Sequence, residues 1–422
     1  MSKFWFILSI ITTTFLPSHL VQADGELSIN IQSKFERAMA LREDGDLFAA
    51  IDIFNEILMI KPSLQRVRLE LATAHYRAAE FDLANELMNE IALDPTVSVN
   101  VKRAVNLFIN KIAQTKQKNE KYRHHWSGDA SISMGSDDNI NIGPDENEFI
   151  IKGAKLTLSD DSKPKDDLMV SWAANLNHNY RIPGSFRIGT RPDTALWQTA
   201  LSFTQHRYIE HSEKLLNLFE GHTGVSLVSQ KNWRANLNLQ LNKFNFAGES
   251  LASFAGINAA WVYNNRIGSE YTLRSQVIYR DYDRQSDKVK NGYRTSIGAD
   301  YSYMLPNKVV LKTGITLQKQ DARVSNKKSK SIDTYSSVLI PVAKKSHVFS
   351  QLNYQATIYE GEVAIFNKQR KDRQQRYTLG LTHRMNKEWN VRAGYSHTDN
   401  DSSVPNFDFK RNQVNVNLSK RF

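Results

Sequence analysis

The 422-residue sequence contains no cysteine. This absence excludes a disulfide scaffold and any metal site built from thiolates, so stability must come from packing and strand pairing. Long apolar runs are also scarce. After residue 23 no stretch approaches the roughly 20 apolar residues that a membrane-spanning helix needs, and the longest candidate, 254–263, is interrupted by Gly256 and Asn258. A chain of this kind spans a membrane only with strands.

Catalytic signatures are missing as well. The sequence has no G-x-S-x-G, no H-E-x-x-H and no glycine-rich phosphate loop. As strand neighbours, His124 and His125 would point to opposite faces, so we interpret them as a polar hinge and not as a metal site. A Ser–His hydrolase on neighbouring strands needs no local motif, and the histidines open to that role are His178, His206, His347 and His383. We therefore predict no enzyme, no cofactor and no metal.

The N-terminus has the features of a secretory signal. Lys3 precedes the apolar run 4–16, and Val21 and Ala23 supply small residues at the two cleavage-recognition positions. This pattern predicts that residues 1–23 are removed after Ala23 and do not anchor the chain in a membrane. The mature chain is then exported.

Charge is divided unevenly along the chain. Residues 24–112 carry 14 acidic and 10 basic side chains, a net charge of −4, whereas the rest, with Lys3 set aside, carries +14. A basic, aromatic-containing region is compatible with nucleic-acid binding, but export and the strand pattern below argue against a nucleic-acid partner. We interpret the excess as a basic barrel lumen, or as basic loops that meet anionic lipid headgroups.

Helical spacing of apolar residues extends from residue 35 to residue 112 and repeats with a period of 34 residues. The positions Ala38, Gly45, Ala50, Phe54 and Ile57 recur as Ala72, Ala79, Ala84, Met88 and Ile91. This period, with small residues where paired helices touch, resembles the tetratricopeptide repeat. Residues 101–112 are predicted to cap the stack. We expect 24–113 to form a periplasmic helical domain, with a plain helical bundle as the alternative, and 114–125 to form a charged linker.

Beyond residue 126 the apolar spacing changes to a period of two. Clear examples are Leu237, Leu239 and Leu241, and then Trp389, Val391, Ala393 and Tyr395. Each run has about the 9 to 11 residues that a tilted strand needs to cross a bilayer. Short polar turns alternate with long polar segments such as 361–375, as they do in bacterial outer-membrane barrels. We predict an α+β chain in which 126–422 form an antiparallel transmembrane β-barrel.

The strand count follows from the turns and from parity. Ten strands lie between residue 233 and the C-terminus, and four more are predicted at 126–135, 149–159, 168–178 and in a segment descending into Gln230. A barrel with both ends in the periplasm needs an even number, so the apolar segment 196–209 is assigned to an outer loop, 181–212. The prediction is 14 strands. In a 16-strand alternative this loop becomes an extra hairpin.

The last strand, 411–422, places Val414, Val416 and Leu418 on one face and ends on an aromatic residue, Phe422. A strand of this kind resembles the closing strand and assembly signal of bacterial outer-membrane barrels. Lys420 departs from that pattern because it lies on the outward, apolar series.

An acidic loop follows the first predicted strand. It contains Asp137, Asp138, Asn139 and Asn141. Carboxylate and amide oxygens suit a hard cation such as calcium, yet the same residues are those that turns prefer. We favour the turn and leave cation binding open.

Together these features resemble the surface lipoprotein assembly modulators, known as Slam proteins. The features are the signal, two tetratricopeptide-like repeats, a first strand that opens on Trp126 and closes at 137–141, and a final strand that ends on Phe422. The resemblance implies a translocator in the outer membrane of a Gram-negative bacterium, with its helical domain in the periplasm. It would move a dedicated lipoprotein, or a secreted haem- or metal-scavenging protein, to the cell surface. Outer-membrane lipids, the barrel-assembly machinery and periplasmic chaperones would be its other partners.

Two sets of residues are candidates for this role. A concave repeat surface suits a client segment, and the client-binding candidates on it are Arg42, Asp46, Arg66, Glu70, His75 and Arg77. A final strand that pairs imperfectly with the first would open sideways or offer an edge to a client strand. The residues of this seam and assembly signal are Trp126, Val414, Val416, Leu418, Lys420 and Phe422. A passive porin and a polysaccharide-export channel are the alternative functions.

Overall fold

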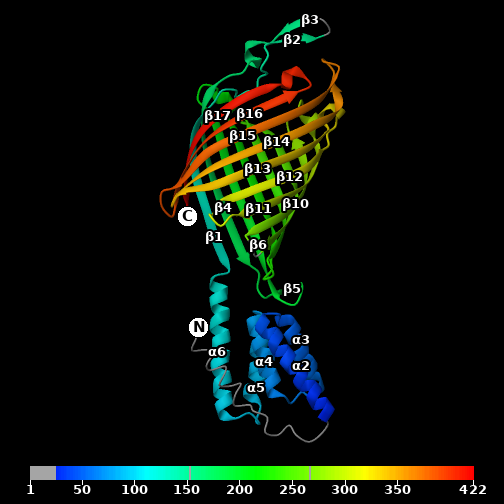
Figure 1. Ribbon diagram of the computed structural model, residues 1–422, viewed down its shortest axis with the longest axis vertical. Coiled ribbons are helices and arrows are strands. Elements are labelled where there is room, and N and C mark those ends of the chain that lie inside the picture. The colour runs from blue at the N-terminus through cyan, green and yellow to red at the C-terminus, as the bar shows by residue number, and fades with distance from the viewer. Residues whose placement is uncertain (1–24, 152–153, 266–267) are drawn as a thin grey trace. The chain divides into compact units, whose positions relative to one another are not determined.

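The computed structural model describes residues 25–422 except 152–153 and 266–267 (Figure 1). The predicted signal, 1–23, lies outside the described residues. Two compact units divide the chain. The first contains the helices up to His125 together with Tyr180–Leu196 and Leu227–Lys231; the second contains Trp126–Asn179, Trp197–Ser226 and Asn232–Phe422.

Within the described residues, five helices make up most of the first unit. They are α2 (Gly25–Asp44), α3 (Leu47–Ile60), α4 (Gln65–Arg77), α5 (Phe81–Leu93) and α6 (Val99–Lys121). Each helix packs against the next one in the chain. Among the described helices, none is both long enough and apolar enough to cross a membrane.

The predicted 34-residue period is visible in the backbone. Gly45 and Ala79, which are equivalent in the two repeats, both have a positive φ, 85° and 62°, where α2 and α4 end. A left-handed residue at this position terminates a helix and turns the chain back. Ala38 and Ala72, also equivalent, have no solvent exposure, so neighbouring helices approach closely there. The repeat itself is present, and its assignment as a tetratricopeptide repeat stays a prediction.

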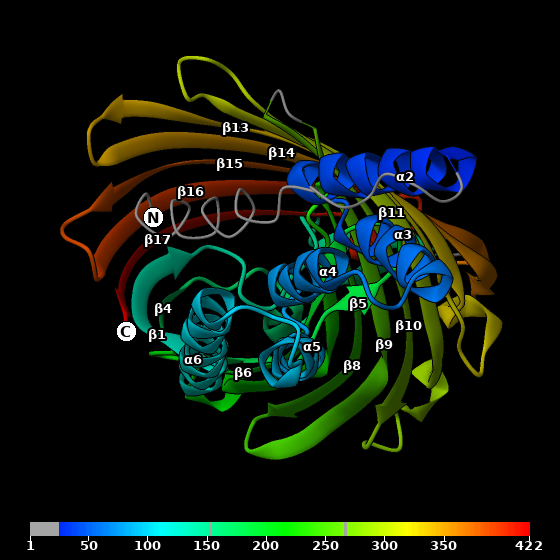
Figure 2. The same ribbon diagram turned by 90° about the horizontal axis from the view of Figure 1, so that it is seen from below.

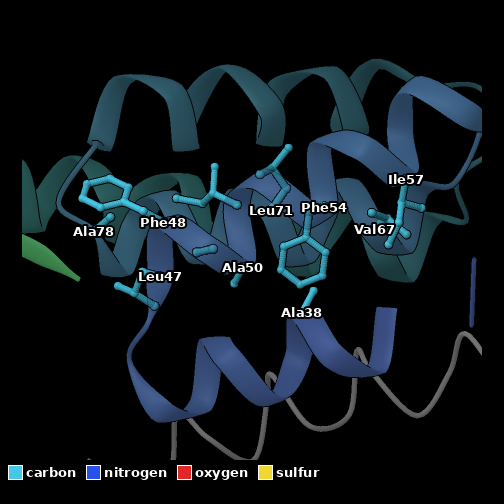
Figure 3. Packing of buried hydrophobic residues seen from close by; sticks show 11 residues of the cluster. Ala38, Leu47, Phe48, Ala50, Phe54, Ile57, Val67, Leu71 and Ala78 are labelled. Carbon is cyan, nitrogen blue, oxygen red and sulfur yellow. The ribbon is translucent and has the colours of Figure 1, made fainter. Parts of the chain in front are cut away.

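Apolar side chains from α2, α3 and α4 fill the core of the first repeat, as Figure 3 shows. Phe54 and Ile57 are fully buried there. A second cluster joins α4, α5 and α6 through Met88, Val105 and Ile112. The α6 helix continues to Lys121, so most of the segment 114–125 that was predicted as a linker is helical. Its charged residues still accept helical geometry, because Lys, Gln and Glu are good helix formers.

The second unit is a closed, antiparallel barrel of 14 strands, and β17 pairs with β1 to close it (Figures 1 and 2). The barrel strands are β1 (His124–Asp137), β4 (Asp167–Arg181), β6 (Pro192–Tyr208), β7 (Leu216–Val228), β8 (Trp233–Phe246), β9 (Glu249–Asn265), β10 (Ser269–Tyr282), β11 (Gly292–Met304), β12 (Val310–Gln320), β13 (Ser329–Ala343), β14 (Ser346–Val363), β15 (Lys368–Arg384), β16 (Trp389–Ser402) and β17 (Phe409–Arg421). The predicted fold class and strand number are confirmed.

Two of the individual strand predictions are wrong. One predicted strand is absent from the barrel and one unpredicted strand is present, so the total of 14 is unchanged. The segment 149–159 supplies no barrel strand, because β2 (Glu148–Ile151) and β3 (Ala154–Thr157) form a separate hairpin. Four residues are too few to cross a bilayer. The segment 196–209, predicted as part of an outer loop over 181–212, belongs instead to the barrel strand β6. It alternates outward apolar residues such as Leu201 and Phe203 with polar ones.

The predicted long loop 361–375 is also mostly strand. β14 continues to Val363 and β15 begins at Lys368, so the turn between them has only four residues. Polar residues hide these strand extensions from a pattern search, because a strand that projects beyond the lipid needs no apolar face. A further two-residue strand, β5 (Phe186–Arg187), pairs with the start of β6.

Apolar and polar side chains alternate along the strands, so the two faces of the barrel wall differ in polarity. On β8, Leu237, Leu239 and Leu241 are each more than half exposed on the outer face. Between them on the inner face, Asn238 Nδ2 donates to Asn258 Oδ1 of β9 at 3.2 Å, and Gln240 Oε1 accepts from Gln276 Nε2 of β10 at 2.8 Å. This arrangement suits lipid outside and water inside.

Candidate functional site

The junction between the first and last barrel strands is a regular antiparallel ladder. Its register extends from Asp129 opposite Arg421 to Asp137 opposite Gln413, which gives nine pairs. On its other edge β17 makes twelve pairs with β16. The seam is therefore closed, and it is the shorter of the two ladders that hold β17.

Phe422 extends the seam by one further pair. Its backbone N–H donates to the Gly128 carbonyl and its carbonyl accepts from the Gly128 N–H, each at 3.0 Å. A Cβ on Gly128 would lie 2.6 Å from two carbons of the Phe422 ring and 2.7 Å from the Asn175 carbonyl oxygen. Glycine at this position thus lets the terminal aromatic ring cover the first strand.

Outward side chains at the seam are mostly apolar. Val414 and Val416 are about half exposed, and Leu418 is half-buried. The exception, Lys420, places its ammonium 5.6 Å from the centroid of the Trp389 ring on β16. On β1, Trp126 stacks on His178 of β4, with ring centroids 4.1 Å apart. Cation–π contact offsets part of the cost of a charge on this face.

The acidic loop ties the first strand to the last. The Asp137 carboxylate is buried, and it accepts two hydrogen bonds from Arg411 Nε, at 2.9 and 3.1 Å, and one from Gln413 Nε2 at 2.9 Å. Tyr208 on β6 donates its hydroxyl to the same carboxylate at 3.3 Å. Next to it, Asp138 accepts both the backbone and the side-chain N–H of Asn412 at 2.6 Å. We call Asp137, Arg411 and Gln413 the seam clamp.

The side chains of the remaining loop residues form hydrogen bonds with backbone groups around the turn. Asn139 Nδ2 donates to the carbonyls of Gly143 and Lys410, at 2.9 Å each, and Asn141 Oδ1 accepts from the Lys165 N–H at 3.0 Å. Among the described residues, no group of three or more His, Asp or Glu side chains could hold a metal ion. The loop oxygens are engaged within the chain.

The helical candidates do not share one open face. Arg42 and Glu70 are buried and form an ion pair, and Arg42 also bonds to Glu43 at 2.7 Å. Arg77 Nη1 lies 3.6 Å from the same Glu43 carboxylate. Burial raises the pKa of Glu70, with Arg42 opposing the shift, and burial lowers the pKa of Arg77. These charges join α2 to α4 and shape the stack from within.

The other candidates have separate partners. His75 Nδ1 lies 2.7 Å from Glu80 Oε2, and the Arg66 guanidinium lies 5.2 Å from the centroid of the Phe35 ring. Within the same unit, Asp46 accepts hydrogen bonds from Thr190 Oγ1 at 2.6 Å and from Arg191 Nε at 3.0 Å. The hydrogen bond from Thr190 is the main cause that lowers the pKa of Asp46. Nothing in the sequence pairs residues this far apart.

Two of the four candidate histidines contact a serine. Ser171 Oγ and His206 Nδ1 lie 2.7 Å apart on β4 and β6, and Ser346 Oγ and His383 Nδ1 lie 2.8 Å apart. No described carboxylate hydrogen-bonds either ring. The third group that orients a catalytic histidine is thus not found among the described residues.

Comparison with known proteins gives one named relative. The chain is 24% identical over 183 residues to a "Surface lipoprotein assembly modifier" from Pasteurella multocida (strain Pm70). The alignment covers 43% of this chain and 32% of the relative, so the chain spans about a third of that relative's length. The family model "Putative beta-barrel porin 2" matches residues 348–422. With the closed barrel, these matches support an outer-membrane barrel protein that is similar, over part of its length, to a surface lipoprotein assembly modifier.

Solved porins also match this chain. The anion-selective porin from Comamonas acidovorans is 9% identical, with a TM-score of 0.39, and the match covers 71% of this chain and 99% of the porin. The outer-membrane channel DcaP of Acinetobacter baumannii is 9% identical, with a TM-score of 0.39, and the match covers 71% of this chain and 97% of the channel.

Proposed function

We propose that this Slam-like chain delivers a dedicated lipoprotein, or a related secreted protein, from the periplasm to the cell surface. The observation that carries the proposal is the combination of a helical repeat unit and a closed barrel in a chain that matches a surface lipoprotein assembly modifier. The helical unit lies in the periplasm and receives the client. The chain acts by transport and not as an enzyme, and it uses no cofactor.

The client crosses at the β1–β17 seam. A lumen cavity of about 420 Å³ is lined both by β1, β4 and β6 and by β14, β15, β16 and β17. A folded domain of about 100 residues has a radius of gyration of about 13 Å, so a folded client would not fit within this one cavity. Opening the nine-pair ladder exposes two strand edges, and an edge can pair with a client strand. The seam clamp must release for this to happen.

Exposed apolar side chains on the helical unit are available for the client. Met59 on α3 and Leu93 on α5 are more than four-fifths exposed, and Val99 on α6 is nearly three-quarters exposed. Large apolar side chains at such exposure suit a protein partner. A client or a periplasmic chaperone would bind there, while Arg42 and Glu70 hold the helices in place. The terminal strand, with Phe422, serves insertion by the barrel-assembly machinery.

Deletion of residues 24–112 tests the role of the helical unit. The barrel should still reach the outer membrane, as shown by a heat-modifiable band on gels, while surface exposure of the client in intact cells is lost. A second variant, Met59→Asp with Leu93→Asp, alters two exposed positions without removing the unit and should also reduce display. Full client display in both variants would refute a receiving role. The client to assay is a lipoprotein encoded in the neighbouring reading frame.

A passive porin is the second candidate, favoured by the basic side chains that face the lumen cavity, Arg376 and Arg392. A porin would conduct small solutes equally well without residues 24–112. It would also leave surface exposure of every lipoprotein unchanged when the chain is absent.

A further inference from the structure

The lumen cavity of about 420 Å³ has an unusual balance of charge. Arg376 of β15 and Arg392 of β16 line one side of it. The other described residues in its lining are neutral or histidine, and none is Asp or Glu. Guanidinium groups remain charged at any physiological pH. A positive charge in a partly enclosed, water-filled space attracts anions and raises their local concentration.

The protein holds Arg392 in position. Its guanidinium lies 4.0 Å from the centroid of the Phe349 ring on β14. Phe349 in turn needs the glycine of the next strand, because a Cβ on Gly380 would lie 2.3 Å from its ring. At Gly394, on the strand beyond, a Cβ would only touch the ring, at 3.7 Å. Stacking on an aromatic face fixes the guanidinium but leaves its N–H donors available to a ligand.

The second arginine has a neutral partner. Arg376 Nη2 donates to Gln413 Oε1 at 3.3 Å, and no carboxylate among the described residues forms an ion pair with it. Two other arginines of the barrel wall have carboxylate partners. Arg274 bonds to Asp300 at 2.6 and 2.9 Å, and Arg234 lies 3.5 Å from Glu270.

Hydroxyl groups line the same cavity. Ser131 and Ser133 of β1 and Ser171 of β4 are among its lining residues. Guanidinium and hydroxyl donors around one water-filled space suit a small anion. We propose that this cavity is an anion-binding site that makes the lumen conduct small anions in preference to cations. This inference does not rest on the proposed delivery of a lipoprotein.

Reversal potentials in a planar bilayer test the proposal. The full chain, placed in a KCl gradient, should prefer chloride to potassium by about tenfold, the lower end of the concentrating effect of a charged cleft. Inorganic phosphate should reduce the chloride current of the unmodified chain. The variant Arg376→Gln with Arg392→Gln should lose most of this preference and be less sensitive to phosphate.

A matched control removes the same charge from the same region of the barrel. Lys371 and Arg373 are exposed on β15 and belong to the alternate series that, by strand geometry, faces away from the lumen. The variant Lys371→Gln with Arg373→Gln should keep the selectivity of the full chain. Equal effects of the two double variants would overturn the proposal. So would an unmodified chain that carries no current, or one that passes potassium as readily as chloride.

Discussion

Arg411 donates two hydrogen bonds from Nε to the carboxylate of Asp137, at 2.9 and 3.1 Å, across the junction of the last and first barrel strands. These residues are distant in the sequence, and the carboxylate is almost fully buried. The contact closes the end of the seam at which the acidic loop begins. Asp137 of the acidic loop therefore belongs to the seam clamp. The sequence alone indicated a turn or a cation site at this position.

Replacing Asp137 by Asn should loosen the barrel at this end. Breaking a buried ion pair while one charge remains typically costs about 3 kcal/mol. We expect a lower urea midpoint for loss of the folded band on gels. The control, Asp161→Asn, removes a carboxylate from an exposed pair with Lys165, for which the expected cost is below about 1 kcal/mol. Equal midpoints for Asp137→Asn and the control would show that the seam clamp does not stabilise the barrel.

Lys420 should prove close to neutral for barrel stability. Its charge on the outer face near the interface costs about 0 to 1 kcal/mol, and its contact with Trp389 returns about 0.5 to 1 kcal/mol. The variant Lys420→Ala is therefore expected to change the unfolding free energy by less than about 1 kcal/mol. A larger gain would mean that the lysine is kept to weaken the seam.

Stability of the helical unit should depend on the ionisation of Glu70. Burial raises its pKa above the ordinary value of 4.5. The stability that this group contributes is complete below the ordinary value and is lost as the pH rises through the raised one. The full chain should therefore lose helical stability relative to Glu70→Gln as the pH rises above 4.5, measured by thermal circular dichroism at 222 nm.

The matched control for that experiment is Glu56→Gln. Glu56 is exposed and pairs with Lys34 at 2.8 Å. Its substitution should leave the pH profile of the full chain nearly unchanged. A Glu70→Gln profile parallel to that of the full chain would contradict the burial of a carboxylate with a raised pKa.

Most of the fold could be predicted from the spacing of apolar residues along the sequence. The spacing of apolar residues indicates which face of a helix or strand is apolar, and this is a local property of the sequence. Examples are the helical spacing that repeats from Ala38 to Ala72 and the alternation from Leu237 to Leu241. The alternation of apolar and polar residues did not predict strand where solvent lies on both faces, as at the extended ends of β14 and β15. It also misled at 149–159, where two short strands make a hairpin that does not cross the bilayer.

The functional contacts were less accessible. Arg411 was part of a predicted strand, and Asp137 part of a predicted loop, but their pairing depends on the register of β1 against β17. The burial of Arg42 and Glu70 depends likewise on how α2 packs against α4. Charged residues in an amphipathic helix read as solvated until the neighbouring helix is placed. No spacing rule in a single sequence reports such contacts.

A reversible lock across the seam tests the proposed route most directly. Residues opposite one another in an antiparallel ladder have Cα atoms about 4.5 to 5.5 Å apart, which is within the range that a disulfide spans. Ile132 opposes Leu418 across the seam, whereas Val391 opposes the same Leu418 across the β16–β17 ladder. Because the chain has no cysteine, each introduced pair can bond only to itself within one chain.

Surface exposure of the client lipoprotein in intact cells is the measurement. The pair Ile132→Cys with Leu418→Cys should abolish display when oxidised and restore it on reduction, while Val391→Cys with Leu418→Cys should display the client in both states. Undiminished display from the oxidised seam pair would contradict passage between β1 and β17.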